Sequence, residues 1–153
     1  MGDQTLKTIS YATAVIGLAI IVLYLFFGRS RPLAVKNIKI GVANVIVEIV
    51  ESFRAQERGL SGRPSLAPDS GMLFVYKDKA IRHFWMPDMN FALDALWIAD
   101  GTVVGWQEGI QPLTNGSITR FQSNAPVDMV LEVNSGWISH NGIKIGDLLT
   151  FLE

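Results

Sequence analysis

The sequence contains no cysteine and only two histidines among its 153 residues. Without cysteine the chain can form no disulfide, offers no thiolate nucleophile and cannot bind zinc through sulfur. The two histidines, His83 and His140, are too few for a histidine-rich metal site. We therefore predict no metal and no cofactor, and leave open only a calcium or magnesium site built from oxygen ligands.

The sequence also lacks an excess of charge of either sign. The chain has 13 lysines and arginines against 14 aspartates and glutamates, and its formal net charge is −1. Binding to nucleic acid needs a concentrated basic face, whereas the basic residues here are scattered, so no nucleic-acid partner is predicted. The signatures Gly-x-Ser-x-Gly and His-Glu-x-x-His and the phosphate-binding loop are absent too. No enzyme class is therefore indicated.

A long run without charge stands near the amino terminus, between Lys7 and Arg29. As a helix, Thr8–Gly28 would be about 30 Å long, the thickness of the hydrocarbon core of a bilayer. We predict a single-pass membrane anchor within residues 1–28, with residues 8–28 in contact with lipid. A cleavable signal peptide is the alternative, but the place of a small-x-small cleavage site is taken by Gly28-Arg29-Ser30, whose middle residue is bulky and charged.

After the apolar run, residues 29–39 are predicted to be a juxtamembrane linker and residues 40–153 one β-rich domain. A short helix is expected from Ser52 to Arg58, ended by Gly59. About eight short strands separated by turn formers favour a small sandwich or barrel. The predicted strands are Val45–Val50, Met72–Tyr76, Ile81–Met86, Ala92–Ala99, Thr102–Glu108, Ile118–Gln122, Met129–Val133 and Leu148–Leu152. The fold class is therefore mainly β, with an N-terminal transmembrane helix.

Several short strings occur in an order that resembles one family. They are Arg-Gly-Leu-Ser-Gly-Arg at 58–63, Gly-Met-Leu-Phe-Val-Tyr at 71–76, Phe-Trp-Met at 84–86 followed by Leu93-Asp94, Leu-Glu-Val-Asn-Ser-Gly-Trp at 131–137 and Gly-Ile-Lys-Ile-Gly-Asp at 142–147. Together they are similar to the bacterial and archaeal family known as domain of unknown function 192, over about Ala43 to Phe151. One departure is Ser61, where relatives commonly have methionine. The resemblance implies a compact, mostly β, sandwich-like fold and no established activity.

The orientation of the predicted anchor is open. Basic residues follow the apolar run at Arg29, Arg31, Lys36 and Lys39, and the positive-inside rule then favours a cytoplasmic domain. The family resemblance implies the reverse, because many relatives carry an export signal or a lipid anchor. We predict a single-pass membrane protein with an extracytoplasmic domain, against the charge flanks.

Three carboxylates stand alone inside apolar runs: Glu48, Asp94 and Glu132. A buried carboxylate must be paired, hydrogen-bonded or protonated, because bare burial costs several kcal/mol. Arg58 and Arg63, from the glycine-rich string, are natural partners because a guanidinium can grip a carboxylate with two hydrogen bonds. We therefore expect Asp94 to lie next to an arginine.

These residues allow two interpretations. In the first they line a cleft together with Trp85 and Met86, which form its apolar wall. In the second the arginines only anchor their loop through ion pairs with the strands.

The two interpretations leave three functions open. The first is a module that binds an anionic or amphipathic ligand or a protein segment, and we favour this non-enzymatic function. The second is a small hydrolase-like enzyme that uses Asp94 with Glu132 or His83. The third is a structural accessory protein without a ligand.

Overall fold

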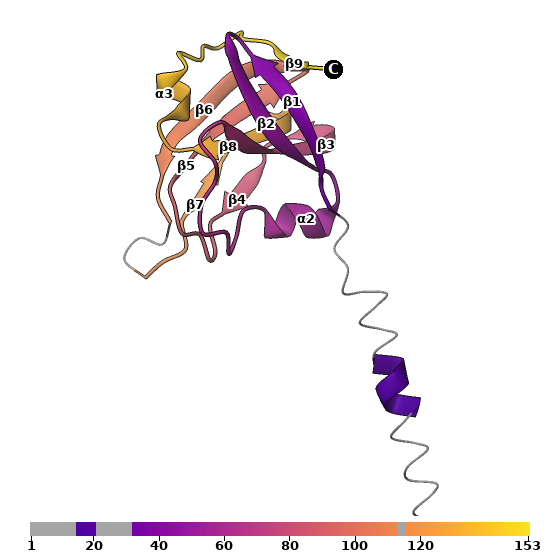
Figure 1. The fold of residues 1–153 in the computed structure, drawn as a ribbon. Helices are drawn as coiled ribbons and strands as arrows, with labels where there is room; N and C mark the ends of the chain where they lie inside the picture. Colours follow the sequence, from indigo (N-terminus) through magenta and orange to yellow (C-terminus); the bar gives the residue numbers. More distant parts are fainter. Residues whose placement is uncertain (1–14, 21–31, 113–115) are drawn as a thin grey trace, which may run out of the picture. The chain divides into compact units, whose positions relative to one another are not determined.

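Nine strands and two short helices make up the domain in the computed structural model, which describes residues 15–20, 32–112 and 116–153 (Figure 1). The elements are β1 (Ala34–Ile40), β2 (Ala43–Val50), α2 (Phe53–Arg58), β3 (Ser70–Ala80), β4 (His83–Trp85), β5 (Leu93–Ala99), β6 (Thr102–Ile110), β7 (Arg120–Gln122), β8 (Val127–Asn134), α3 (Trp137–His140) and β9 (Leu149–Phe151). The predicted mainly β class is confirmed, and each predicted strand and the predicted helix overlap an observed element.

Strand β1 and helix α3 do not appear among the predicted elements. The sequence predicts residues 29–39 as a linker, whereas the structure places Ala34–Ile40 in the sheet, paired with β2. Only Ile38 and Ile40 of this strand are buried, so its exposed first half gives no alternating pattern. Helix α3 has four residues, too few for a helical period to be recognised.

The predicted membrane span lies mostly outside the described residues. Residues 15–20 are helical. Within the ranges that the structure describes, no helix is long and apolar enough to cross a membrane. An anchor through residues 8–28 therefore stays a prediction of the sequence.

Seven strands form one sheet in the order β6-β5-β8-β3-β2-β1-β9, and β4 and β7 form a separate pair. The large sheet is curled (Figure 1), and its two edges come together at one end, where an isolated bridge joins Thr102 and Leu148. Near β9 the Leu149 amide donates to the Gly101 carbonyl at 2.8 Å, and the Val103 amide of β6 donates to the Asp147 carbonyl at 2.9 Å. Of the two architectures predicted, the structure is the barrel-like one, because these bonds link the edges that a sandwich would leave apart.

Both faces of the central strands are buried. On one face Leu73, Leu96 and Leu131 pack with Trp137 and Ile138 of α3. On the other face a second cluster, which includes Phe74, Trp97 and Val130, packs under Leu60 and under Phe121 of β7. Because side chains alternate along a strand, neighbouring residues of β5 and β8 point into different clusters. An isolated carboxylate on either strand is therefore enclosed whichever way it points.

The position of α2 follows from the direction of two neighbouring strands. β2 and β3 are parallel, so the chain must cross back from the end of one to the start of the other. Residues 51–69 make this crossover, and α2 is part of it. The Gln56 Nε2 donates to the Val75 carbonyl at 3.0 Å and fixes the helix to β3. Gly59 ends the helix with a φ of +48°, a conformation that favours glycine. In Figure 1, α2 and β4 lie at the same end of the sheet.

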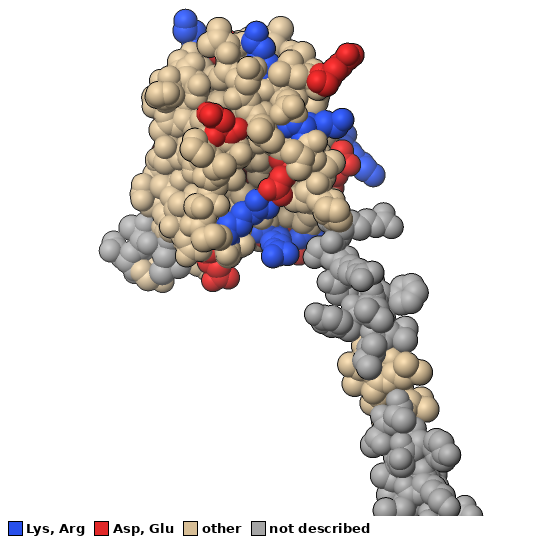
Figure 2. Space-filling view, viewed as in Figure 1, with Lys and Arg blue, Asp and Glu red and all other residues tan. Residues whose placement is uncertain are grey.

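Charged side chains of both signs share the surface. Figure 2 shows basic and acidic residues close together on the right of the face viewed, and a mostly uncharged area on its left. Two exposed pairs are Lys79 with Asp100, and Arg82 with Asp78 at 3.0 Å.

Candidate functional site

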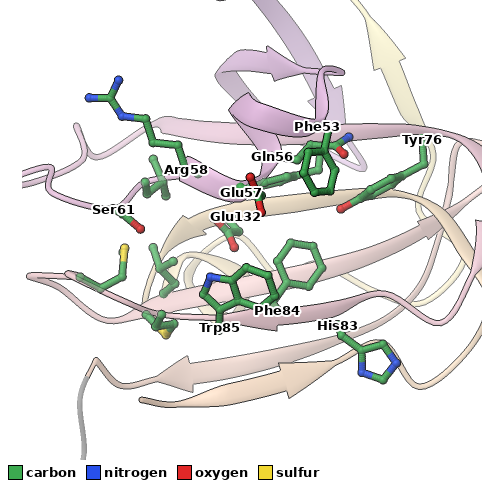
Figure 3. A pocket seen from close by; sticks show the side chains of 16 residues that line it. Phe53, Gln56, Glu57, Arg58, Ser61, Tyr76, His83, Phe84, Trp85 and Glu132 are labelled. Carbon is green, nitrogen blue, oxygen red and sulfur yellow. The ribbon is translucent and has the colours of Figure 1, made fainter. Parts of the chain in front are cut away.

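A pocket of about 170 Å³ lies between α2 with its following loop and strand β4 (Figure 3). Its walls are largely apolar and rich in aromatic rings: Phe53, Phe74, Tyr76, Phe84 and Trp85, with Leu60, Met86, Met89 and Leu93. Its polar side chains are Gln56, Glu57, Arg58, Ser61, His83 and Glu132. An apolar hollow with a few polar groups is the usual form of a site for a small molecule.

Glu132 is the most buried of the polar side chains that line the pocket. It lies on the central strand β8, paired with Met72 of β3 and Ala95 of β5, and it is only 6% exposed. No hydrogen bond or ion pair joins its carboxyl group to another residue of the described ranges. Burial raises the pKa of Glu132 to about 8, because loss of water disfavours the charged form. At neutral pH this carboxyl group is therefore mostly protonated.

The aromatic wall next to Glu132 is part of a packed cluster. Phe84 contacts Phe74 edge-on, with ring centroids 5.3 Å apart, and stacks on Phe121 at 5.3 Å. Two rings are instead open to solvent, Phe53 at 73% and Trp85 at 51% exposed. Figure 3 shows Phe53 on the α2 side and Trp85 on the β4 side, with Glu132 between them. The inner wall is therefore packed against other rings, while two exposed rings flank the opening.

Tyr76 joins the pocket to a half-buried cation, Arg82. The Arg82 guanidinium lies 3.9 Å from the centroid of the Tyr76 ring, in the arrangement of a cation–π contact. Burial raises the pKa of the Tyr76 hydroxyl to about 12; the Arg82 charge opposes this rise and the Glu132 charge adds to it. The hydroxyl, which points towards the centre of the view in Figure 3, therefore keeps its proton and can donate it to a hydrogen bond.

Four of the seven candidate residues line this pocket: Arg58, Trp85, Met86 and Glu132. Arg58 is exposed, and in Figure 3 its guanidinium points away from the pocket. The His83 ring also points away. Glu48, Arg63 and Asp94 are not part of the lining. The predicted cleft of Arg, Asp and Trp is therefore replaced by one of Glu, Tyr, Phe and Trp.

Arg63 meets a strand carboxylate, but that carboxylate is Glu48. Nη1 of Arg63 donates a hydrogen bond to Oε1 of Glu48 at 2.5 Å, and Nη2 of Arg63 donates one to Oε2 of Glu48 at 2.7 Å. The hydrogen bonds from Arg63 hold the pKa of Glu48 below its usual range and raise the pKa of Arg63 itself. The expectation that an arginine of the glycine-rich loop pairs with a strand carboxylate is confirmed here, and this pair anchors the loop.

We expect a coupling free energy of about 1 kcal/mol between Glu48 and Arg63, because a forked pair that is about one-third exposed is only partly screened by water. A double-mutant cycle with Glu48→Gln and Arg63→Gln, followed by urea denaturation at pH 7, measures it. Since the pKa of Glu48 is lowered on folding, the coupling is present above the unfolded pKa and is lost as the pH falls through the folded one. Zero coupling at pH 7 would show that the fork does not hold the loop.

The expectation that Asp94 lies next to an arginine is wrong. Asp94 is fully buried and accepts two main-chain hydrogen bonds, from the Gly109 amide at 2.9 Å and from the Ile138 amide in α3 at 3.2 Å. The register between β5 and β6 shifts between Leu93 and Ala95, and this irregularity frees the Gly109 amide from the ladder. Amides that the sequence pattern does not reveal therefore take the place of the expected arginine.

Asp94 and Glu132 lie on opposite faces of the sheet. Asp94 pairs with Val133 across β8, and Glu132 pairs with Ala95 across β5. Paired residues share a face and neighbours alternate, so the two carboxyl groups cannot meet. The structure thus does not bring together the Asp94–Glu132 pair of the hydrolase hypothesis. Within the described ranges, no group of three or more His, Asp or Glu residues could hold a metal.

Sequence reasoning missed several pocket residues, among them Phe53, Phe74, Tyr76 and Glu57. Phe74 and Tyr76 alternate along β3 on the same side as Met72, which pairs with Glu132. The alternation was visible in the sequence, but only the pairing of β3 with β8 shows that this side faces Glu132.

The model of the family DUF192, described as "Uncharacterized ACR", matches residues 35–151. A crystal structure from Sinorhizobium meliloti 1021, described as "a putative transcription regulator", is 30% identical with a TM-score of 0.73, over 80% of this chain and 98% of that one. A protein of unknown function from Novosphingobium aromaticivorans DSM 12444 is 23% identical with a TM-score of 0.69, over 79% of this chain and 93% of that one. No curated protein matches the sequence significantly.

Proposed function

We propose that this chain, which belongs to the DUF192 family, is a binding module whose pocket under α2 takes a small ligand on the carboxyl group of Glu132. One observation carries the proposal. Glu132 is buried and has no partner within the described ranges, yet it lines an open pocket. A ligand that bonds to this carboxyl group would supply the missing partner.

The cost of leaving Glu132 unpaired supports this proposal. The Glu132 side chain is only 6% exposed, and moving a carboxyl group into largely apolar surroundings costs free energy when no hydrogen bond from the protein replaces the lost water. The same face of the sheet carries apolar side chains such as Met72 and Val130, so a residue of that kind would fit the core at this position. A carboxyl group that lowers the stability of the fold at this position therefore supports a role in binding.

The size of the pocket agrees with a small ligand. An engineered apolar cavity of about 150 Å³ holds benzene, and this pocket measures about 170 Å³. A ligand of about six to eight non-hydrogen atoms would fit. The exposed rings of Phe53 and Trp85 offer apolar surface to any part that extends outside.

Binding is favoured over hydrolysis by the placement of the polar groups. Asp94 is engaged with two amides on the other face of the sheet, and the His83 ring points away from the pocket. Neither pair named in the hydrolase hypothesis faces the pocket. Attachment of the module to a membrane through residues 8–28 belongs to the same proposal and is supported by the charge-free run of the sequence.

Fragments of six to ten non-hydrogen atoms, both neutral and charged, are expected to bind at the pocket in the full chain. Their binding should shift the amide NMR signals of Phe53, Tyr76, Trp85 and Glu132. Trp85→Ala should lower the affinity of the fragments that bind by about tenfold, because it removes an aromatic wall.

The control is Ile145→Ala, which truncates a side chain of similar exposure (68%) outside the pocket and should leave the affinities unchanged. If the shifts gather elsewhere, or if no fragment binds, the pocket is not a ligand site.

A further inference from the structure

We propose that the ligand of this pocket is a small organic cation, an alkylammonium group that sits against the Glu132 carboxylate within the aromatic walls. This inference rests on the proposed function, since it names the class of ligand for the same pocket.

The charges that face the pocket favour a cation. Glu57 and Glu132 both line it, and Figure 3 shows both side chains near the centre of the view. Arg58 also belongs to the lining, but its guanidinium points outwards. Among the lining residues that the structure describes, no cationic side chain points into the pocket to pair with an anionic ligand. An ammonium ion would form an ion pair with Glu132 and remove the reason for its protonation.

The aromatic lining favours the same class of ligand. Ammonium groups are attracted to the faces of Trp, Tyr and Phe rings, and cages of such rings recognise methylated ammonium ions. Five aromatic residues line this pocket. Tyr76 already contacts a cation, the Arg82 guanidinium at 3.9 Å from its ring centroid. A carboxylate floor with aromatic walls therefore suits an alkylammonium group better than a strongly hydrated metal ion.

Binding of such a cation would be linked to the release of a proton. The pKa of Glu132 is about 8 without a ligand, so below that pH the carboxyl group must lose its proton before it can pair with the ammonium. The titratable or charged residues that line the pocket with it are Tyr76 from β3, Glu57 and Arg58 from α2 and His83 from β4. The Arg58 guanidinium and the His83 ring point away, and the β5 residue of the lining, Leu93, carries no charge. Affinity for a cation should therefore rise with pH and level off above about pH 9.

The test compares choline with its neutral carbon isostere, 3,3-dimethylbutan-1-ol, by NMR titration of the full chain from pH 6.5 to 8.5. The two probes share their shape, so charge alone distinguishes them. Choline should bind about 20-fold more tightly at pH 8.5 than at pH 6.5, in line with the ionised fraction of Glu132. The neutral isostere should bind more weakly than choline at pH 8.5 and gain nothing as the pH rises.

Two variants connect the result with Glu132. Glu132→Gln keeps the shape of the side chain. It should lower the affinity for choline by at least about tenfold at pH 8.5 and remove the dependence of that affinity on pH. Glu51→Gln makes the same chemical change at an exposed residue outside the lining. It should leave the affinity for choline and its pH dependence unchanged. The dispersion of the amide signals checks that each variant is folded.

The possible failures can be told apart. If the isostere binds as tightly as choline at pH 8.5, or if Glu132→Gln leaves choline binding unchanged, the ligand is not a cation held by Glu132, although the pocket remains a binding site. If choline fails to bind while neutral fragments bind, the inference is again overturned and the proposed function stands. If neither choline nor any fragment binds at the pocket, both are wrong.

Discussion

Asp94→Ala is expected to lower the free energy of unfolding by about 2–5 kcal/mol. The Asp94 carboxylate is fully buried and accepts the amides of Gly109 and Ile138. Each buried donor left without an acceptor costs on the order of 1–3 kcal/mol. The substitution orphans both donors, and it removes the group that fixes α3 to the irregular edge of β6. Urea denaturation followed by tryptophan fluorescence would measure the loss.

Asp128→Ala provides the matched control. Asp128, which is half-buried, also accepts a main-chain amide, that of Asp100 at 3.2 Å, but this hydrogen bond is exposed to water. Water can replace that acceptor, so the loss should stay below about 1 kcal/mol. Asp94→Asn keeps one oxygen as an acceptor and should fall between the two. Equal losses for Asp94→Ala and Asp128→Ala would contradict the role assigned to Asp94.

The second large effect is expected from Glu132→Gln, whose stability relative to the wild type should increase with pH. The pKa of Glu132 is raised on folding to about 8, so between about pH 4.5 and 8 the folded chain holds a proton that the unfolded chain has released. Stability of the wild type then falls as the pH rises, by roughly 1 kcal/mol per pH unit and a few kcal/mol in total. Glutamine does not titrate, and this loss disappears in the variant.

Urea denaturation at pH values from 5 to 9 would measure this difference. The two proteins should be similar at pH 5, and the variant should be the more stable by a few kcal/mol at pH 9. Other carboxylates, such as Glu48, titrate in both chains and cancel in the comparison. Glu51→Gln, an exposed control, should follow the wild type at every pH. Parallel curves for Glu132→Gln and the wild type would mean that the Glu132 carboxyl group is not desolvated in the folded protein.

These two carboxylates show how a sheet can give similar residues different roles. Asp94 and Glu132 come from adjacent strands and are both buried. Asp94 meets two amides and holds the fold, whereas Glu132 meets none within the described ranges and opens to a pocket. A residue that costs stability at a binding site is a common compromise between stability and function. The same substitution, Glu132→Gln, should therefore strengthen the fold and weaken the binding of a cation.

Much of the local structure could be predicted from neighbouring residues. The apolar run around Glu48 predicts β2, and Gly59 predicts the end of α2, because strand alternation and a left-handed glycine are local effects. Strand β1 could not be predicted in this way, since it depends on pairing with β2. The partner of Asp94 was out of reach too: the Ile138 amide lies 44 residues further along the chain.

The sequence by itself determined a mainly β domain, its membership of a family, and the fact that Glu48, Asp94 and Glu132 need an explanation, because composition, alternation and the cost of a buried charge are properties of the chain. Only the tertiary structure decided which explanation each one has. Pairing of β8 with β3 and β5 sets Glu132 beneath α2, and the irregular β5–β6 register presents an amide to Asp94. Contacts between distant strands depend on the register and the curl of the sheet, and neither can be predicted from a short segment of the sequence.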